Sequence, residues 1–200
     1  MKKIFVFALV ALMTAMGAKA QSDEPRNEIG VSYGLGISMI GDGIGHGIGE
    51  GLFDGIVGRK WTNDKQFGSL AVEYFRHLDN PKLAIGGIVT FSQYGEDVEY
   101  QGTKEGERKR KYISVMPSVK YYYVNKKSFG MYSKLGLGGM LLHSKSEDVK
   151  TGKSDTDSKF YVAYQVSALG LEAGSQNLRA FLEAGFGEQG IVLAGLRCKF

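Results

Sequence analysis

Apolar and polar residues alternate along most of the chain with a period of two, which predicts β-strands rather than helices. In residues 113–123, for example, Ile113 and Val115 lie on one face of the expected strand and Ser114 lies on the other. A loss of phase near Leu169 indicates a β-bulge in the sixth segment. The eight expected strands lie near residues 27–39, 69–78, 83–92, 113–123, 129–141, 159–173, 178–186 and 192–200.

The links between these segments alternate in length. Long links are expected at residues 40–66, 95–110 and 143–158, and short ones at 79–81, 125–127, 174–177 and, as the one exception to the alternation, 187–190. Long loops at one end and tight turns at the other are typical of outer-membrane barrels. The expected fold class is therefore all-β: a closed, antiparallel, eight-stranded, up-and-down transmembrane β-barrel with both termini at the turn end.

The positions that alternate with the bulky apolar residues hold mostly Gly, Ser, Ala and Thr. A soluble barrel that carries a ligand, as lipocalins do, would expose this second face to water and fill it with charged residues. Small side chains instead suit the crowded interior of an eight-stranded barrel, so the bulky face would contact lipid.

Isolated charges on the small-residue face would then point into the barrel, where an unpaired charge is costly. Such charges should therefore pair with one another. We expect an interior charge network of Glu73, Lys134, Glu183 and Arg197.

The start of the chain has the pattern of a cleaved signal peptide. Two lysines follow Met1, residues 4–13 are apolar, and Ala18 and Ala20 have the spacing of a cleavage site. The apolar run is about half as long as a transmembrane helix requires. The expected organisation is a signal peptide at 1–20, a short segment at 21–26 and an outer-membrane barrel at 27–200.

Removing residues 1–20 changes the charge of the chain. The whole sequence has 25 Lys and Arg against 21 Asp and Glu, and three of the lysines lie in the first twenty residues. The remainder has 22 basic and 21 acidic residues, a net charge of +1, which gives no reason to expect nucleic acid as a partner. The single cysteine, Cys198, excludes an internal disulfide.

The last strand has an alternating pattern that finishes on Phe200, and residues 183–190 before it are rich in glycine. This strand resembles the signal by which the assembly machinery recognises outer-membrane barrels, with Phe200 as the assembly signal. Residues 27–200 resemble the small outer-membrane β-barrel family, the eight-stranded OmpA/OmpX-like and OmpW-like group. The resemblance implies a location in the cell outer membrane, contact with outer-membrane lipid and lipopolysaccharide, and the barrel assembly machinery as a partner during biogenesis.

The first long link contains a four-residue repeat with several interpretations. The repeat spaces potential metal ligands evenly, but the glycines between them provide no rigid geometry, so we expect no metal site. It also spaces apolar residues as on an amphipathic helix, which would lie on the lipid interface or cap the barrel; a flexible glycine loop is the third possibility. The ligand-type residues are Asp42, His46, Glu50 and Asp54, and the apolar ones are Ile44, Ile48, Leu52 and Ile56.

The second long link is basic. Contact with lipopolysaccharide phosphates is one interpretation of this run, and a solvated loop surface is the other. The basic residues are Lys104, Arg108, Lys109, Arg110 and Lys111.

No catalytic or cofactor-binding residues are predicted. A lipid-modifying enzyme of the outer membrane could use a His–Ser pair, but His143 and Ser144 are adjacent in an expected strand and so point to opposite faces. His77 is expected near the turn end and His46 in a loop. The glycines of the first link lack the lysine and the strand-to-helix setting of a phosphate-binding motif.

The sequence therefore predicts an integral outer-membrane β-barrel with a structural, adhesion or interaction role through its extracellular loops. The alternative is a narrow pore for small solutes, although eight strands leave little lumen. A soluble secreted ligand-binding barrel and a lipid-modifying enzyme are less favoured. No cofactor is expected, and the sequence does not identify the extracellular partner.

Overall fold

The computed structural model describes residues 25–35, 60–100, 103–148 and 154–200, with the backbone alone at 60–67, 94–100, 103–109, 146–148 and 154–155. None of the described residues forms a helix long and apolar enough to cross a membrane. Eight strands follow one another along the chain: β1 (Asn27–Leu35), β2 (Lys60–His77), β3 (Leu83–Tyr100), β4 (Thr103–Asn125), β5 (Phe129–Asp148), β6 (Ser154–Gly174), β7 (Leu178–Gly187) and β8 (Val192–Lys199).

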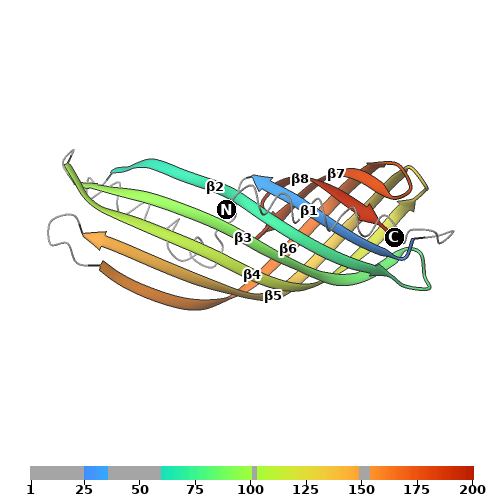
Figure 1. Cartoon of the computed structure of the whole chain (residues 1–200), viewed down its shortest axis with the longest axis horizontal. Coiled ribbons are helices and arrows are strands. Elements are labelled where there is room, and N and C mark those ends of the chain that lie inside the picture. Colours follow the sequence, from blue (N-terminus) through green and yellow to red (C-terminus); the bar gives the residue numbers. More distant parts are fainter. Residues whose placement is uncertain (1–24, 36–59, 101–102, 149–153) are drawn as a thin grey trace.

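The strands form a closed barrel in which each strand pairs antiparallel with the next, and β1 pairs antiparallel with β8 (Figure 1). In the closing pair, Ile29 lies opposite Cys198 and Val31 lies opposite Leu196. The closed eight-stranded antiparallel barrel expected from the sequence is thus confirmed. Closure leaves no unpaired sheet edge where all eight strands are present.

The two ends of the barrel differ. Tight turns join β2 to β3, β4 to β5 and β6 to β7 at one end, which we call the turn end. The chain also starts and finishes its barrel there, because the Asn27 N–H donates to the Phe200 carbonyl and the Phe200 N–H to the Asn27 carbonyl, both at 2.8 Å. The opposite end is the loop end.

Burial alternates along the strands as the hydrophobic pattern predicts. On β4 the even-numbered residues from 112 to 122 are buried, and the odd-numbered residues from 111 to 123 are exposed. The exposed residues are large and apolar: Leu137 and Phe160 are 63% and 69% exposed. The buried ones include the apolar cluster of Phe75, Ile88, Met116 and Met140 together with many polar side chains. The apolar surface of this barrel is therefore on its outside.

The exposed apolar residues form a band of limited height. On β4 they run from Ile113 to Tyr123, beyond which the outward residue toward the loop end is Lys111. Ten steps of about 3.3 Å along a strand tilted by about 40° give a band roughly 25 Å high. Transmembrane barrels have an apolar band of about this height.

The expectation of long loops at residues 95–110 and 143–158 was wrong, because strands occupy most of both segments. Gly95 pairs with Lys109, Tyr100 pairs with Thr103, and Glu147 pairs with Ser154. β2 likewise begins at Lys60 rather than near residue 69. These strand ends lie beyond the apolar band, so their sequence shows no alternation of apolar and polar residues. Backbone hydrogen bonds nevertheless continue the pairing of the strands there.

As a result, β2 to β6 continue past the ends of β1, β7 and β8, toward the left of Figure 1. We call residues 60–67, 93–100, 103–111, 143–148 and 154–158 of these strands the extended sheet. Within the described part of the chain, β2 pairs with β1 only from Ser69 onward and β6 pairs with β7 only from Gln165 onward. The extended sheet therefore has two edges, on β2 and β6, that no described strand pairs with.

The loss of phase predicted near Leu169 is confirmed as a β-bulge. Ser167 pairs with Gly185 and Leu169 pairs with Ala184, so Ala168 is the extra residue. The bulge moves the buried positions of β6 from odd to even numbers, which turns Glu172 toward the interior.

The turn between β7 and β8 folds over the interior at the loop end. Gly187 and Gly190 bound it with φ angles of 143° and 113°, which are rarely adopted by residues with a side chain. The Gln189 N–H donates to the inward-facing Gln165 side chain at 2.8 Å, and the Glu188 N–H donates to the Tyr164 carbonyl at 2.9 Å. Glu188 and Gln189 are consequently buried.

Candidate functional site

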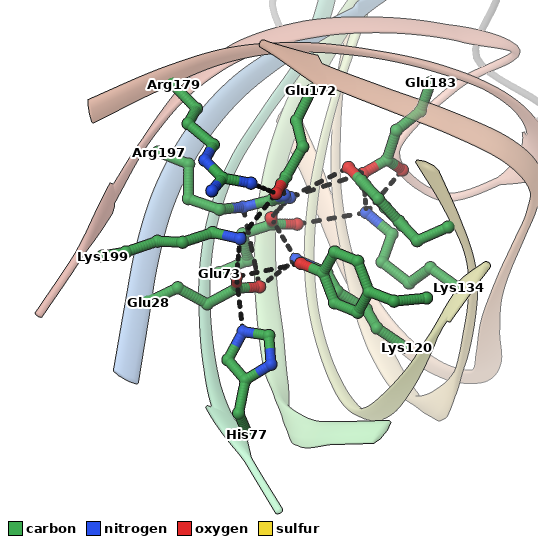
Figure 2. A network of polar contacts seen from close by, with 12 residues as sticks. Glu28, Glu73, His77, Lys120, Lys134, Glu172, Arg179, Glu183, Arg197 and Lys199 are labelled. Carbon is green, nitrogen blue, oxygen red and sulfur yellow. Dashed lines mark hydrogen bonds and ion pairs between the residues drawn. The ribbon is translucent and has the colours of Figure 1, made fainter. Parts of the chain in front are cut away.

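The four charged residues predicted to share the barrel interior lie together (Figure 2). They come from four strands: Glu73 from β2, Lys134 from β5, Glu183 from β7 and Arg197 from β8. The Lys134 Nζ atom lies 3.1 Å from Glu73 Oε2 and 2.6 Å from Glu183 Oε2. Arg197 Nη2 lies 2.5 Å from Glu73 Oε1 and 3.8 Å from Glu183 Oε1.

Five further charged residues belong to the same group. Lys120 Nζ lies 2.6 Å from Glu28 Oε1 and 2.9 Å from Glu73 Oε1. Glu172 accepts from Arg179 and Arg197, and from Lys199 at 2.5 Å. We call the nine residues the interior charge network: Glu28, Glu73, Lys120, Lys134, Glu172, Arg179, Glu183, Arg197 and Lys199.

Sequence reasoning did not assign these five residues to the interior charge network, although a signal for most of them was present. Glu28 has the parity of the inward Gly30, Lys120 that of Ser118, and Lys199 that of Arg197. Glu172 lies beyond the bulge, where parity counted from the start of β6 gives the wrong face. The alternation already places Lys120, Arg179 and Lys199 on the small-residue face, and extending the inward set of the first strand to its start would have added Glu28.

Neutral side chains complete the hydrogen bonding of the carboxylates. The Tyr122 hydroxyl donates to Glu28 at 3.0 Å, and the Tyr132 hydroxyl donates to Glu183 at 2.6 Å. Aromatic rings also face the cations: Lys120 Nζ is 3.8 Å from the centre of the Phe75 ring. Such contacts between a cation and a ring are attractive and strengthen when water is excluded.

The interior charge network is removed from water, since its most exposed members, Arg179 and Lys199, are only 3% exposed. Transferring a charge out of water costs several kcal/mol, and the cost is offset only by close partners and further hydrogen bonds. The network contains four carboxylates and five cations. Every strand except β3 contributes at least one charged residue, so the pairs connect nearly the whole circumference of the barrel.

The interior charge network and the apolar cluster lie in the barrel interior, and the two described histidines lie at its edge and on its outer face. His77 Nε2 lies 3.2 Å from Glu28 Oε2 at the edge of the network. His143 hydrogen bonds with Ser158 of the next strand, with Nδ1 3.1 Å from Oγ, rather than with Ser144. His143 and Ser158 are both exposed, and no carboxylate contacts His143 within the described part of the chain.

No described group of three or more His, Cys, Asp and Glu side chains is placed to hold a metal. The possible ligands of the first link, Asp42, His46, Glu50 and Asp54, and its apolar stripe lie outside the described residues, as does the expected signal peptide.

Glu188, in the turn that folds over the loop end, is a buried carboxyl outside the strands. It is 3% exposed, and burial raises the pKa of its carboxyl to about 7. The carboxyl of Glu188 therefore binds its proton more tightly in the folded protein than in the unfolded chain.

An apolar outer band and an ionic interior define a class of protein: closed eight-stranded antiparallel barrels whose polarity is the inverse of a water-soluble barrel. No protein-family model and no curated protein matches the chain. Among solved structures, it is similar to Ail, the attachment invasion locus protein of Yersinia pestis. The complex of Ail with the heparin analogue sucrose octasulfate has 18% sequence identity and a TM-score of 0.46, over 88% of this chain and 96% of that chain. Another crystal structure of Ail has 18% identity and a TM-score of 0.42, over 88% and 95%.

Replacing Glu73 is expected to weaken the barrel strongly. Glu73→Gln removes the carboxylate shared by Lys120, Lys134 and Arg197 and leaves buried cations without compensation, so the free energy of unfolding should fall by about 3–5 kcal/mol. Urea unfolding of the barrel in detergent micelles measures the change. Asp79→Asn is the control, because Asp79 is 98% exposed in its pair with Arg26, and it should cost less than about 1 kcal/mol. Equal stability of the two variants would contradict the assignment.

Glu188→Gln is expected to remove a pH dependence. The unfolded carboxyl loses its proton near pH 4.5, whereas the folded one keeps it to about pH 7. The free energy of unfolding of the native chain should therefore fall as the pH rises through this window. The variant should match the native chain at pH 4 and exceed it by up to about 3 kcal/mol at pH 8. Parallel pH profiles of the two proteins in urea unfolding would refute the prediction.

Proposed function

We propose that this protein is an integral barrel of the bacterial outer membrane that presents its extended sheet outside the cell as an interaction surface. The observation that carries the proposal is the inverted polarity of the barrel. In water, the exposed apolar band would be costly, and the buried ions would gain nothing from their position. In a bilayer the same band contacts hydrocarbon and the ions stay in the protein interior.

The boundaries of the band support the same proposal. Toward the loop end, the outward residues change from Ile113 to Lys111 on β4, and from Leu141 to His143 and Lys145 on β5. A change from apolar to basic residues over one step fits the border between hydrocarbon and lipid headgroups. We propose that Lys111 and Lys145 contact lipopolysaccharide phosphates there, since ammonium groups pair well with phosphate oxygens.

The ion pairs and apolar side chains of the interior support a structural anchor over a narrow pore. A pore requires a continuous path of water, whereas the ion pairs of Glu73, Lys134 and Arg197 cross the interior and the apolar cluster lies beside them. The exposed His143–Ser158 pair has no described third group to orient it, which argues against an enzyme.

The extended sheet is the feature that favours an interaction role. Its edges on β2 and β6 carry backbone N–H and C=O groups that no described strand pairs with. Such edges accept an added strand from a partner, with backbone hydrogen bonds providing affinity. An extracellular protein segment in extended conformation is the partner that this geometry fits.

Lipid contact can be tested with one charge at two heights. Leu137→Arg places a cation in the middle of the apolar band, where it should cost about 2–4 kcal/mol in a bilayer and reduce recovery of folded barrel in the outer-membrane fraction. Thr156→Arg is the control, because Thr156 is exposed beyond the band and should tolerate the change. Membrane fractionation followed by gels of boiled and unboiled samples reports both location and folding. Recovery of the native chain in the soluble fraction, or equal tolerance of both variants, would contradict the proposal.

The orientation of the barrel is tested separately with epitope tags. A tag inserted between Tyr100 and Thr103, at the tip of the β3–β4 hairpin, should bind antibody on intact cells. A tag inserted between Lys126 and Lys127, in the β4–β5 turn, should bind only after the outer membrane is permeabilised. The reverse labelling would place the extended sheet inside the cell envelope.

A further inference from the structure

A pocket at the turn end lies next to the interior charge network and has no role in the proposed function. Its volume is about 250 Å³, and three turns, the segment before β1 and the inner ends of β7 and β8 surround it. It is smaller than the typical site of a drug-sized ligand, which indicates a small occupant. We call it the turn-end pocket.

The lining of the turn-end pocket is strongly basic. Its single acidic residue, Asp79, is 98% exposed and already pairs with Arg26 at 3.3 Å. Counting His77 as neutral, five cations and one carboxylate leave an excess of four positive charges. The basic lining residues are Arg26, His77, Lys126, Lys127, Arg179 and Lys199.

The interior neutralises only part of this excess. Arg179 and Lys199 pair with Glu172 in the interior charge network, where five cations face four carboxylates. With Arg26, Lys126, Lys127 and Asp79 added, eight cations face five carboxylates, so an excess of three positive charges remains. Burial makes such an imbalance costly, and an anion at the mouth of the barrel would reduce it. The turn-end pocket adjoins the network, because Arg179 and Lys199 line it.

Hydrogen bonds between the turns hold the walls of the pocket in place. Arg179 Nη2 donates to the carbonyls of Lys126 and Lys127 at 2.7 and 2.9 Å, which fixes the β4–β5 turn over the pocket. Asn125 Nδ2 donates to the Pro81 carbonyl at 3.1 Å and ties this turn to the β2–β3 turn. A site whose walls are fixed before binding loses less entropy when a ligand enters.

We propose that the turn-end pocket binds a phosphate-bearing anion. Phosphate oxygens accept charge-assisted hydrogen bonds from ammonium and guanidinium groups, and several cations around one small space suit a group with more than one negative charge. The phosphate belongs either to a soluble phosphate ester or to the headgroup of a lipid in the adjacent leaflet. The pocket argument does not require a membrane; only the lipid source rests on the proposed function.

The test uses the full barrel in a non-ionic maltoside detergent at low ionic strength. Inorganic phosphate and glycerol 1-phosphate are titrated while NMR records the backbone amides of Lys126 and Lys127. We expect saturable shifts at these amides and a dissociation constant about fivefold to tenfold weaker in the double variant Lys126→Gln, Lys127→Gln. Both lysines are exposed, so the variant should keep the heat-shift of a folded barrel.

Lys82→Gln is the matched control, because Lys82 is an exposed lysine of the β2–β3 turn that does not line the pocket. It should bind both phosphates as the native chain does. Absence of saturable shifts in the native chain, or equal weakening by Lys82→Gln and the double variant, would overturn the proposal, whether or not the barrel fractionates with the outer membrane.

A second arm identifies the source of the phosphate. The native barrel is placed in bilayers of phosphatidylcholine, with and without phosphatidylglycerol, and titrated again with inorganic phosphate. Loss of phosphate binding when phosphatidylglycerol is present would identify the lipid headgroup as the occupant. Unchanged binding would identify a soluble phosphate. Either result supports the phosphate site. Absence of phosphate binding to the barrel in both bilayer preparations would overturn it.

Discussion

The buried ion pairs are the constraint on which the rest of this barrel depends. Glu73 alone receives hydrogen bonds from Lys120, Lys134 and Arg197, which come from β4, β5 and β8. Each of these three contacts joins Glu73 to a strand outside its own hairpin, so the network is complete only when the barrel has closed. A shift of register by one residue would turn each inward charge toward the apolar outside, which makes the correct register by far the least costly.

The same constraint explains the distribution of residue types. When the outer face contacts hydrocarbon, burying apolar side chains cannot drive closure, because lipid tails are equally apolar. Closure must then gain its free energy inside, from ion pairs, hydrogen bonds and packing. The interior contains all three, with the Tyr132 hydroxyl bonded to Glu183 and Phe75 packed under the Lys120 ammonium group. An apolar outer face thus requires stabilising interactions in the interior, and the interior charge network provides them.

The sequence predicted the parts of this structure that follow from local alternation. It predicted eight strands, their faces, the bulge near Leu169 and the inward direction of Glu73 and Arg197, because a half-buried strand repeats every two residues. It did not predict the extended sheet, since strands with water on both faces have no alternation. Nor did it assign Glu172 to the interior, because the bulge at Ala168 reverses the parity of β6, and the pocket at the turn end arises from turns far apart in the chain.

Ion pairs that cross the interior fit the proposed role of a structural anchor. Arg197 hydrogen bonds with residues of β2 and β5. The surfaces proposed for interaction lie at the two ends of the barrel. At the loop end, backbone edges that no described strand pairs with suit an added strand, whereas the excess positive charge at the turn end suits a small anion. Because Arg197 pairs with Glu28 of β1 and Glu73 of β2, the interior charge network ties the closing strands together between these two surfaces.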